Sequence, residues 1–248
     1  MRIIAGQYRR RRLQGPPAGA TTRPIPDSVK EAIFNLLRGH FEGEAVVDLF
    51  AGTGALGIEA LSRGASKVVF VERDRRVIKI LEENLAEVGS PRAGEIAAGD
   101  ALGTPALSRC PKPVHIIFMD PPYALVREPE SWDRVRAHAA RMIAMLDDTG
   151  YCVLRTPWPH IYRPDEPAVD RTTASSAVEA AGELAQEMSR GVNPNRPRPL
   201  DLDLSIEGAI GPETHAYGTT AVHLYMRDTG DAEAHADAGD SPPPGPSA

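Results

Sequence analysis

The sequence predicts an α/β fold with a doubly wound, Rossmann-like sheet that is mostly parallel and carries an antiparallel C-terminal hairpin at its edge. Three observations lead to this expectation. Apolar, β-branched runs alternate with helix-length segments between residues 45 and 155, as in proteins built from βαβ units. A glycine-rich turn follows the first run. The last two apolar runs, 201–207 and 219–227, have no helix between them, which indicates a hairpin.

Hydrophobic periodicity places the individual elements of this fold. The expected strands are residues 45–50, 67–71, 95–98, 115–119 and 151–154, and the expected helices are residues 26–37, 55–63, 75–88 and 132–146. In the first helix, Asp27 or Ser28 can cap the first turn. Its apolar side chains recur at helical spacing, namely Val29, Ile33, Phe34 and Leu37. We expect that face to pack against the sheet.

Composition changes after the fifth strand. Residues 156–200 are rich in Pro, Ala and Glu, contain a helical candidate at 174–188 and indicate an insertion. Residues 229–248 consist mainly of Ala, Asp, Gly and Pro, so we expect a disordered tail. The expected organisation is therefore a basic N-terminal arm and helix at 1–40, one domain at 41–228 that contains the insertion, and a tail at 229–248.

Overall composition is that of a globular protein. The chain has 248 residues, of which 42% are hydrophobic and 25% charged, enough for one large domain with appendages. No stretch approaches the roughly 18 apolar residues of a membrane span, and the N-terminus lacks a signal-peptide core. We therefore expect a cytoplasmic protein without a membrane partner. Cys110 and Cys152 are the only cysteines, and their spacing supports neither a disulfide framework nor a metal site.

Positive charge is concentrated in the N-terminal arm. Residues 1–30 contain seven basic residues and one acid, a balance of +6, so with −6 overall the rest of the chain carries −12. A basic arm on an acidic body favours a polyanionic partner such as RNA or DNA. A solvated, disordered N-terminus is the alternative, but Ile3, Ile4 and Tyr8 give the arm material to pack. The candidate RNA-binding residues are Arg9, Arg10, Arg11, Arg12, Arg23 and Lys30.

A glycine pattern follows the first strand and opens a helix. Gly52, Gly54 and Gly57 have the G-x-G-x-x-G spacing, which lets the backbone turn tightly and approach a cofactor. Glu72 ends the next strand, where an acid can accept the ribose hydroxyls of an adenosine cofactor. The pattern alone fits both a nicotinamide cofactor and S-adenosylmethionine.

Three acids favour S-adenosylmethionine. Asp48 lies inside the first strand, where a carboxylate can bind the amino group of a methionine moiety, whereas a pyrophosphate would gain nothing from negative charge there. Asp100 follows the third strand, where it can hold the adenine edge. Asp120 follows the fourth strand at the same edge of the sheet. The neighbouring residues complete the predicted cofactor site: Phe50, Ala51, Thr53, Arg73 and Ala101.

The predicted catalytic residues follow the strand 115–119. Asp120, Pro121, Pro122 and Tyr123 form a rigid loop, because two prolines fix their φ angles and remove two N–H donors. Free carbonyls, a carboxylate and an aromatic ring together suit a planar group that carries an NH2. A plain strand-to-turn junction is the alternative for this loop taken alone.

With these motifs in this order, the chain resembles a class I S-adenosylmethionine-dependent methyltransferase that acts on an exocyclic amine. The segments Gly6–Leu13, Arg23-Pro24 and Asp27–Asn35 further resemble the bacterial 16S rRNA guanine-N2 methyltransferase family, the RsmD type. The resemblance covers residues 1–155 and resumes at the hairpin. It implies S-adenosylmethionine as cofactor and, as partner of a monomeric enzyme, 16S rRNA, the small ribosomal subunit or its assembly intermediate. It also implies that Phe34 and Asn35 lie near the methionine end.

The chain departs from that family at several positions. Ile25-Pro26 stands where Thr follows Arg-Pro, Lys30 replaces an arginine, and Arg155 ends a strand where the family tends to carry an acid. The same acceptor loop also fits an adenine amine in DNA or a glutamine amide in protein. A nicotinamide-dependent oxidoreductase and a catalytically idle RNA-binding factor are further alternatives.

Overall fold

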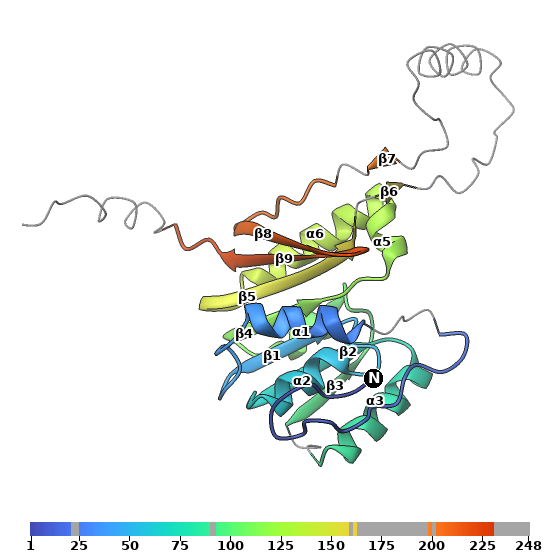
Figure 1. Cartoon of the computed structure of the whole chain (residues 1–248). Coiled ribbons are helices and arrows are strands. Elements are labelled where there is room, and N and C mark those ends of the chain that lie inside the picture. The colour runs from blue at the N-terminus through green and yellow to red at the C-terminus, as the bar shows by residue number, and fades with distance from the viewer. Residues whose placement is uncertain (21–24, 90–92, 159–160, 163–197, 200–201, 231–248) are drawn as a thin grey trace, which may run out of the picture.

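A seven-stranded sheet in the order β3-β2-β1-β4-β5-β9-β8 is the centre of the molecule (Figure 1). The computed structural model describes residues 1–20, 25–89, 93–158, 161–162, 198–199 and 202–230. Strands β1 to β5 are parallel to one another, and β9 runs antiparallel to both β5 and β8. The predicted α/β class, with a mostly parallel sheet and an antiparallel hairpin at one edge, is confirmed.

The strands of this sheet and its helices alternate along most of the chain. The strands are β1 Ala45–Leu49, β2 Lys67–Glu72, β3 Gly94–Ala98, β4 Val114–Met119, β5 Leu146–Pro157, β8 Ala209–Tyr217 and β9 Thr220–Arg227, and a separate pair is formed by β6 Ile161–Tyr162 and β7 Arg198–Pro199. The helices are α1 Asp27–Leu36, α2 Ala55–Ser62, α3 Arg75–Glu87, α4 Thr104–Arg109, α5 Tyr123–Arg127 and α6 Pro129–Ile143.

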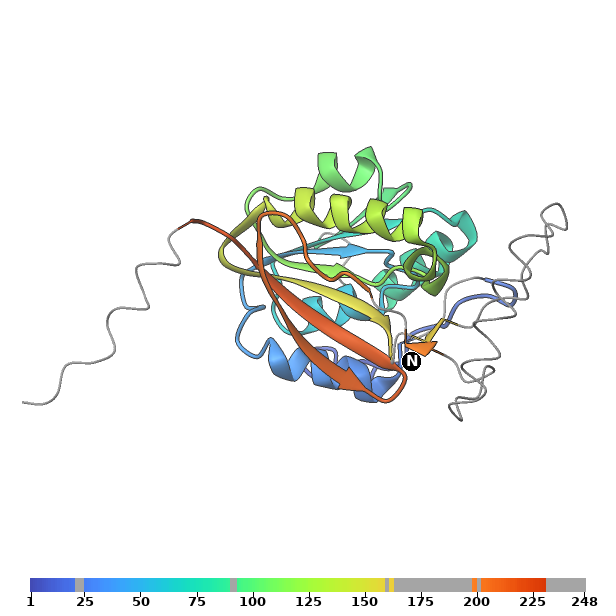
Figure 2. The same ribbon diagram turned by 90° about the horizontal axis from the view of Figure 1, so that it is seen from above.

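Helices cover both faces of the sheet, as Figure 2 shows with α1 on one side and α6 on the other. Buried side chains of α1, α2 and α3 form one apolar cluster with one face of the strands, and α4, α5 and α6 form a second cluster with the other face. In the first, Phe34 of α1 packs against Phe41 and Phe118 with ring centroids 4.9 and 5.6 Å apart. The central strands are buried on both sides, which explains their uniform apolar runs.

The N-terminal arm is folded onto the first cluster. Backbone bonds join Ile3 N to Arg11 O (3.0 Å) and Leu13 N to Met1 O (3.1 Å), so the arm doubles back on itself. Ile3 and Leu13 are buried among residues of α1 and α2. The arm then runs past α2 and α3 (Figure 1), where the backbone N–H of Gln7 donates to Ser62 O at 2.7 Å. A solvated, disordered arm is therefore excluded for residues 1–20.

The hairpin lies later in the chain than its pattern predicted. Residues 202–206 are not a strand, and the outer strand is β8, which lies between the two runs that were predicted to pair. The alternating apolar residues of this segment, Leu202, Leu204 and Ile206, pack against the α6 side of the core instead. Two backbone oxygens of this segment are bound by side chains, since Trp132 Nε1 donates to Asp203 O and Tyr225 Oη donates to Leu204 O.

Several element boundaries also differ from those predicted. Strand β5 begins at Leu146, and α6 begins at Pro129, three residues before the predicted start. The short helices α4 and α5 have no counterpart in the prediction. The expected helix at 174–188, most of the expected insertion and residues 231–248 of the expected tail lie outside the described residues. Among the described residues, no helix has the length and apolar character to cross a membrane.

Candidate functional site

The predicted site residues follow strands that end at one edge of the sheet. Parallel register pairs Leu49 with Val71 and Met119, Glu72 with Ala98, and Met119 with Leu154. The loops after β1, β2, β3 and β4 therefore begin side by side at the carboxyl edge, where ligands bind in open α/β sheets. The sequence predicted this convergence from the order of strands and motifs alone.

The glycine loop after β1 has a strained backbone. Phe50 has φ +60°, a conformation that is uncommon for a residue with a side chain, and Gly52 and Gly54 follow with φ +55° and +87°. Gly54 is the residue before α2, so the loop turns directly into the helix N-terminus. Strain of this kind persists where surrounding structure enforces it, and it is common at ligand-binding sites.

Asp48 is a buried carboxylate beneath this loop. Its Oδ2 accepts the backbone N–H of Gly57 at 2.8 Å, and its other oxygen has no hydrogen-bond donor among the described residues. Burial raises the pKa of Asp48 well above its usual value, the Gly57 N–H opposes that rise, and the nearby carboxylates of Asp120 and Glu72 add to it. A cationic ligand group would relieve this electrostatic cost.

Glu72 holds the loops after β1 and β2 together. One of its oxygens accepts the backbone N–H groups of Arg73 and Asp74 at 2.8 and 2.9 Å, and the other accepts the N–H of Gly52 at 3.0 Å. The carboxylate is buried and fixed in direction. Its Oε2 retains a lone pair for a ligand hydroxyl, because only one donor occupies it.

The remaining predicted cofactor residues occupy different environments. Asp100 is exposed after β3, and its Oδ1 accepts the N–H of Leu102 at 3.0 Å. Arg73 is exposed, whereas Ala101 is buried in the core. Gly57 has a packing role, since a Cβ there would lie 2.2 Å from the Phe70 ring. The sequence placed these residues near one edge without distinguishing ligand contacts from packing.

One pocket joins the cofactor loop to the acceptor loop. The predicted residues that line it are Asp48, Phe50, Ala51, Gly52, Thr53 and Asp120. The arm contributes three lining residues that the sequence did not single out, Met1, Pro16 and Ile25, and α2 contributes Ala55 and Leu56. The pocket therefore brings Asp120 of the acceptor loop beside the glycine loop, whereas the predicted residues Glu72, Asp100 and Tyr123 do not line it. No motif marks the arm residues, because their place in the wall depends on the fold.

The acceptor loop forms an ion pair with Arg155 of β5, a residue outside the loop's own motif. Arg155 at the end of β5 donates from Nε and Nη2 to the two oxygens of Asp120, each at 2.7 Å. Its guanidinium also lies 5.8 Å from the ring centre of Tyr123 and 3.4 Å from the Tyr123 hydroxyl. Pro121 is buried, and Pro122 precedes the first turn of α5. Burial raises the pKa of Asp120, while the Arg155 charge and hydrogen bonds oppose the rise.

The arginines of the arm are exposed, as a role in RNA binding requires. Arg9, Arg10, Arg11 and Arg12 all face solvent. Arg11 donates to Glu87 O at 2.6 Å and lies over the Tyr8 ring, and the other three side chains have no hydrogen bond or ion pair with any described residue. Arg23 lies outside the described residues.

The structure contradicts an RNA contact for Lys30. Its side chain is 1% exposed, and its Nζ lies 3.1 Å from Glu59 Oε2 and donates to Arg2 O at 2.7 Å. A phosphate cannot reach this ammonium group without breaking the buried pair. The prediction was wrong because a basic residue in a basic segment was counted as solvent-facing, although Lys30 follows Val29 on the apolar stripe of α1.

Two buried polar residues that the motifs did not include connect the arm to the pocket. Asn84 donates to Thr53 O at 2.9 Å and accepts from the N–H of Gln14 at 2.8 Å. Glu59 accepts from the N–H groups of Ile4 and Ala5 at 2.8 and 2.9 Å. A sequence signal existed for Asn84, which interrupts an apolar stripe on a helix.

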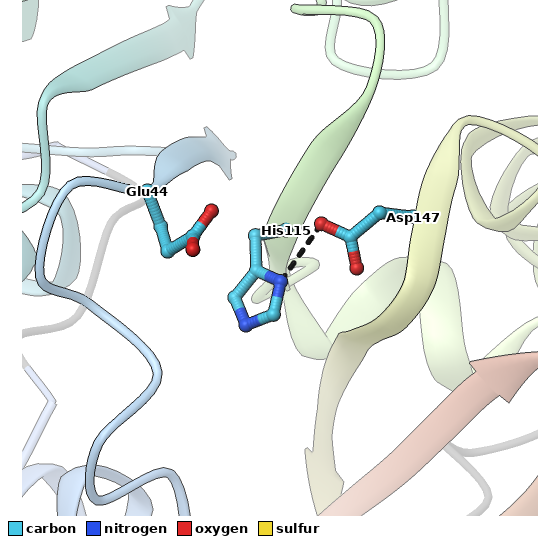
Figure 3. Close-up of side chains that lie close together, drawn as sticks. All are labelled: Glu44, His115 and Asp147. Carbon is cyan, nitrogen blue, oxygen red and sulfur yellow. Dashed lines mark hydrogen bonds and ion pairs between the residues drawn. The ribbon is translucent and has the colours of Figure 1, made fainter.

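A second polar cluster lies at the opposite, amino edge of the sheet (Figure 3). One ligand atom each of Glu44, His115 and Asp147 lies within 4.8 Å of the others. His115 Nδ1 is 2.8 Å from Asp147 Oδ2, and its Nε2 is 3.0 Å from His40 Nδ1. Both ring nitrogens are thus hydrogen-bonded, which accounts for the cluster without a cation. The absence of a metal from the protein stays a prediction.

Comparison with known proteins identifies relatives over most of the folded chain. YlbH of Bacillus subtilis (strain 168) is 41% identical over 124 residues, which cover 50% of this chain and 67% of YlbH. Ribosomal RNA small subunit methyltransferase D of Escherichia coli (strain K12) is 39% identical over 151 residues, which cover 61% of this chain and 69% of that protein. The solved structure of yhhF from Escherichia coli superposes with a TM-score of 0.61 at 25% identity, covering 92% of this chain and 98% of that one.

These similarities agree with the sheet order and with the glycine and acceptor loops. The fold is that of the class I methyltransferases. The family model described as conserved hypothetical protein 95 matches residues 1–149, more than half of the chain. The chain is therefore a methyltransferase that belongs to the family described as conserved hypothetical protein 95, the RsmD type that its motifs resembled.

Proposed function

We propose that this enzyme transfers a methyl group from S-adenosylmethionine to the exocyclic 2-amino group of a guanine in the 16S rRNA of the small ribosomal subunit. The observation that carries the proposal is the shared pocket, in which Asp48 beneath the glycine loop and Asp120 of the acceptor loop line one cavity. The name of its Escherichia coli relative, ribosomal RNA small subunit methyltransferase D, supports the substrate class.

The donor set around the glycine loop fits S-adenosylmethionine. The free oxygen of Asp48 suits the ammonium of the methionine moiety, and Glu72 presents a fixed carboxylate oxygen to the ribose. Asp100 and Ala101 stand at the next strand end, where an adenine edge can be held. When bound, the cofactor supplies an electrophilic methyl group on a sulfonium centre. A nicotinamide cofactor is disfavoured, because the buried carboxylate of Asp48 would repel a pyrophosphate.

The acceptor loop supplies what a weakly nucleophilic aromatic amine requires. The amine lone pair is delocalised into the base, so oxygen acceptors on its N–H groups shift electron density toward nitrogen. Asp120 and the carbonyl of Pro121 are the candidate acceptors. The ring of Tyr123 provides a stacking surface for a flipped-out base, a contact worth about 1–3 kcal/mol. No strong base is needed, because the amine proton becomes acidic only after methyl transfer.

The arm suggests how the RNA is held. Four exposed arginines, Arg9 to Arg12, lie on the arm, and three other arm residues, Met1, Pro16 and Ile25, wall the cofactor pocket. The arm is therefore the candidate for binding phosphates of the RNA that carries the target base. We propose a monomeric enzyme that meets its substrate in the cytoplasm, where ribosomal RNA is assembled. The substrate form, whether naked RNA, the small subunit or an assembly intermediate, is part of the test below.

The test is methyl transfer with labelled S-adenosylmethionine, using purified 16S rRNA, small subunits, duplex DNA and a protein pool as separate acceptors. The expected result is label in a single guanine of 16S rRNA, located by nucleotide mapping, and none in DNA or protein. Asp120→Asn should reduce turnover at least about 100-fold while leaving S-adenosylmethionine affinity near that of the wild type. Label in adenine or in glutamine would contradict guanine as the substrate and would show that the enzyme methylates another amine. Binding of S-adenosylmethionine without transfer to any acceptor would contradict it in favour of an idle RNA-binding factor.

A further inference from the structure

Arg155 is a charged residue beside the acceptor loop to which no motif assigns a role. It lies in β5 one residue beyond Leu154, the last residue of β5 that pairs with β4. This register places its side chain beside Asp120, which follows β4. The side chains of Arg155 and Asp120 are only 10% and 17% exposed, so the pair is largely shielded from water.

The contact between these residues is bidentate. Nε and Nη2 of Arg155 each lie 2.7 Å from a different oxygen of Asp120, the geometry in which a planar guanidinium fixes the plane of a carboxylate. The same guanidinium approaches the Tyr123 ring, 5.8 Å from its centre, and the Tyr123 hydroxyl at 3.4 Å. One side chain thus touches both functional groups of the acceptor loop.

A consequence for charge follows from the surroundings of Asp120. The charged groups that face it are Asp48 from β1 and Arg155 from β5, and the guanidinium of Arg155 also contacts the Tyr123 hydroxyl of α5. Burial raises the pKa of Asp120, and Arg155 is the cation that opposes the rise. Without Arg155, two carboxyl groups would share a buried pocket with no positive charge among the groups that face Asp120.

We propose that Arg155 is a positioning residue for methyl transfer, which holds the Asp120 carboxylate and the Tyr123 ring in the relative orientation that receives the target amine. The proposal rests on the function proposed above. With both oxygens of Asp120 already bound by Arg155, the amine meets only the remaining lone pairs of the carboxylate, and the Pro121 carbonyl completes the acceptor pair. The charge of Arg155 also favours the ionised form of Asp120, in which the carboxylate accepts rather than donates a hydrogen bond.

The test compares Arg155→Met, Arg155→Lys and a matched control, Arg136→Met. The control removes an arginine of α6 that pairs with Asp133 and Asp203 and does not line the pocket. We expect Arg155→Met to lower kcat about 100-fold with KM for S-adenosylmethionine changed less than about threefold. Its kcat should fall as the pH is lowered, because Asp120 then takes up a proton. Arg155→Lys should restore a flat pH profile but only part of kcat, since lysine keeps the charge and loses the bidentate geometry. Arg136→Met should leave kcat and its pH profile unchanged.

A measurement on the free protein separates this proposal from the function itself. Carbon-13 NMR titration of the Asp120 carboxyl group, assigned with Asp120→Asn, should give a higher pKa in Arg155→Met than in the wild type. An unchanged Asp120 titration, or a kcat of Arg155→Lys or Arg155→Met equal to that of the wild type, would overturn the role of Arg155. A wild-type enzyme that methylates no RNA would sink the proposed function instead, whatever the titration shows. If Arg155→Met does not fold, Arg155→Lys and its kcat decide the question.

Discussion

Asp48 is a carboxylate in the interior of a strand that is otherwise apolar. A buried, incompletely paired acid costs free energy, because water is removed from its charge. Here the N–H of Gly57 recovers part of that cost, and the open side faces the pocket. The burial of the group raises its pKa, so a cationic ligand that binds there favours release of the proton.

We expect Asp48→Asn to weaken S-adenosylmethionine binding about 10- to 100-fold, because a hydrogen bond to a charged group is worth about 1.5–3 kcal/mol. In the wild type, affinity should rise with pH through the raised pKa of Asp48, since the charged form binds the ammonium and the protonated form does not. Isothermal titration in buffers of different ionisation enthalpy should detect the released proton. Glu82→Gln, on the exposed side of α3, is the control. An Asp48→Asn protein with wild-type affinity and pH dependence would exclude the ammonium contact.

The elements that could be predicted are those whose signal is local. Strand β4 is a continuous apolar run, and the glycine loop is a short pattern in a strand-to-helix context, so both were placed correctly. The outer strand of the hairpin could not be placed, because Leu202, Leu204 and Ile206 alternate like a strand but pack beside α6 without a strand partner. Contacts between residues far apart in the sequence also could not be predicted. Arg155 meets Asp120 across 35 residues, and the burial of Lys30 depends on Glu59 of another helix.

Gly57 allows α2 to approach β2 closely, and its replacement tests that contact. A Cβ at this position would lie 2.2 Å from Cε1 of Phe70 and 2.9 Å from a methyl group of Val68. We expect Gly57→Ala to lower the free energy of unfolding by about 1–3 kcal/mol and to weaken cofactor binding, because the displaced helix carries the glycine loop with it. Urea unfolding and titration with S-adenosylmethionine measure the two effects.

Gly15→Ala is the matched control for this substitution. A Cβ there would meet no atom within 4 Å, so stability should change by less than about 0.5 kcal/mol. Equal stability of the two variants would mean that the helix can shift without cost, and that the third glycine of the motif is not required for packing.

At the scale of the whole molecule, the arm and the body of the chain carry opposite charge, and the fold fixes the arm on the body. The body of the chain is acidic, and the basic arm is bound to it by backbone hydrogen bonds and by buried Ile3 and Leu13. Composition predicted the polyanionic partner but not the fixed position of the arm, because its contacts with α2 and α3 join residues more than fifty positions apart. Arg9, Arg10 and Arg12 are left exposed on the arm.

Replacing Arg9, Arg10 and Arg12 together by Ala should weaken binding to 16S rRNA at low salt and reduce the slope of log K against log salt by about 2–3, if each side chain meets one phosphate. The melting temperature should not change, because these side chains have no bonding partner among the described residues. The control replaces Arg134 and Arg141, which are exposed on α6 on the other face of the sheet. An unaltered salt slope in the triple variant, or an equal effect of the control, would show that the arm does not hold the phosphates.

Glu59 gives helix α2 a second function beyond packing. Its carboxylate binds the backbone of the arm at Ile4 and Ala5, while the same helix begins at Gly54 in the loop over the cofactor pocket. Arm and loop are therefore joined by a helix of only eight residues. This connection allows the two binding sites to be coupled. If RNA bound to the arm changes the affinity for the cofactor by some factor, the bound cofactor must change the affinity for RNA by the same factor. The coupling between the two substrates then has the same size whichever of them binds first.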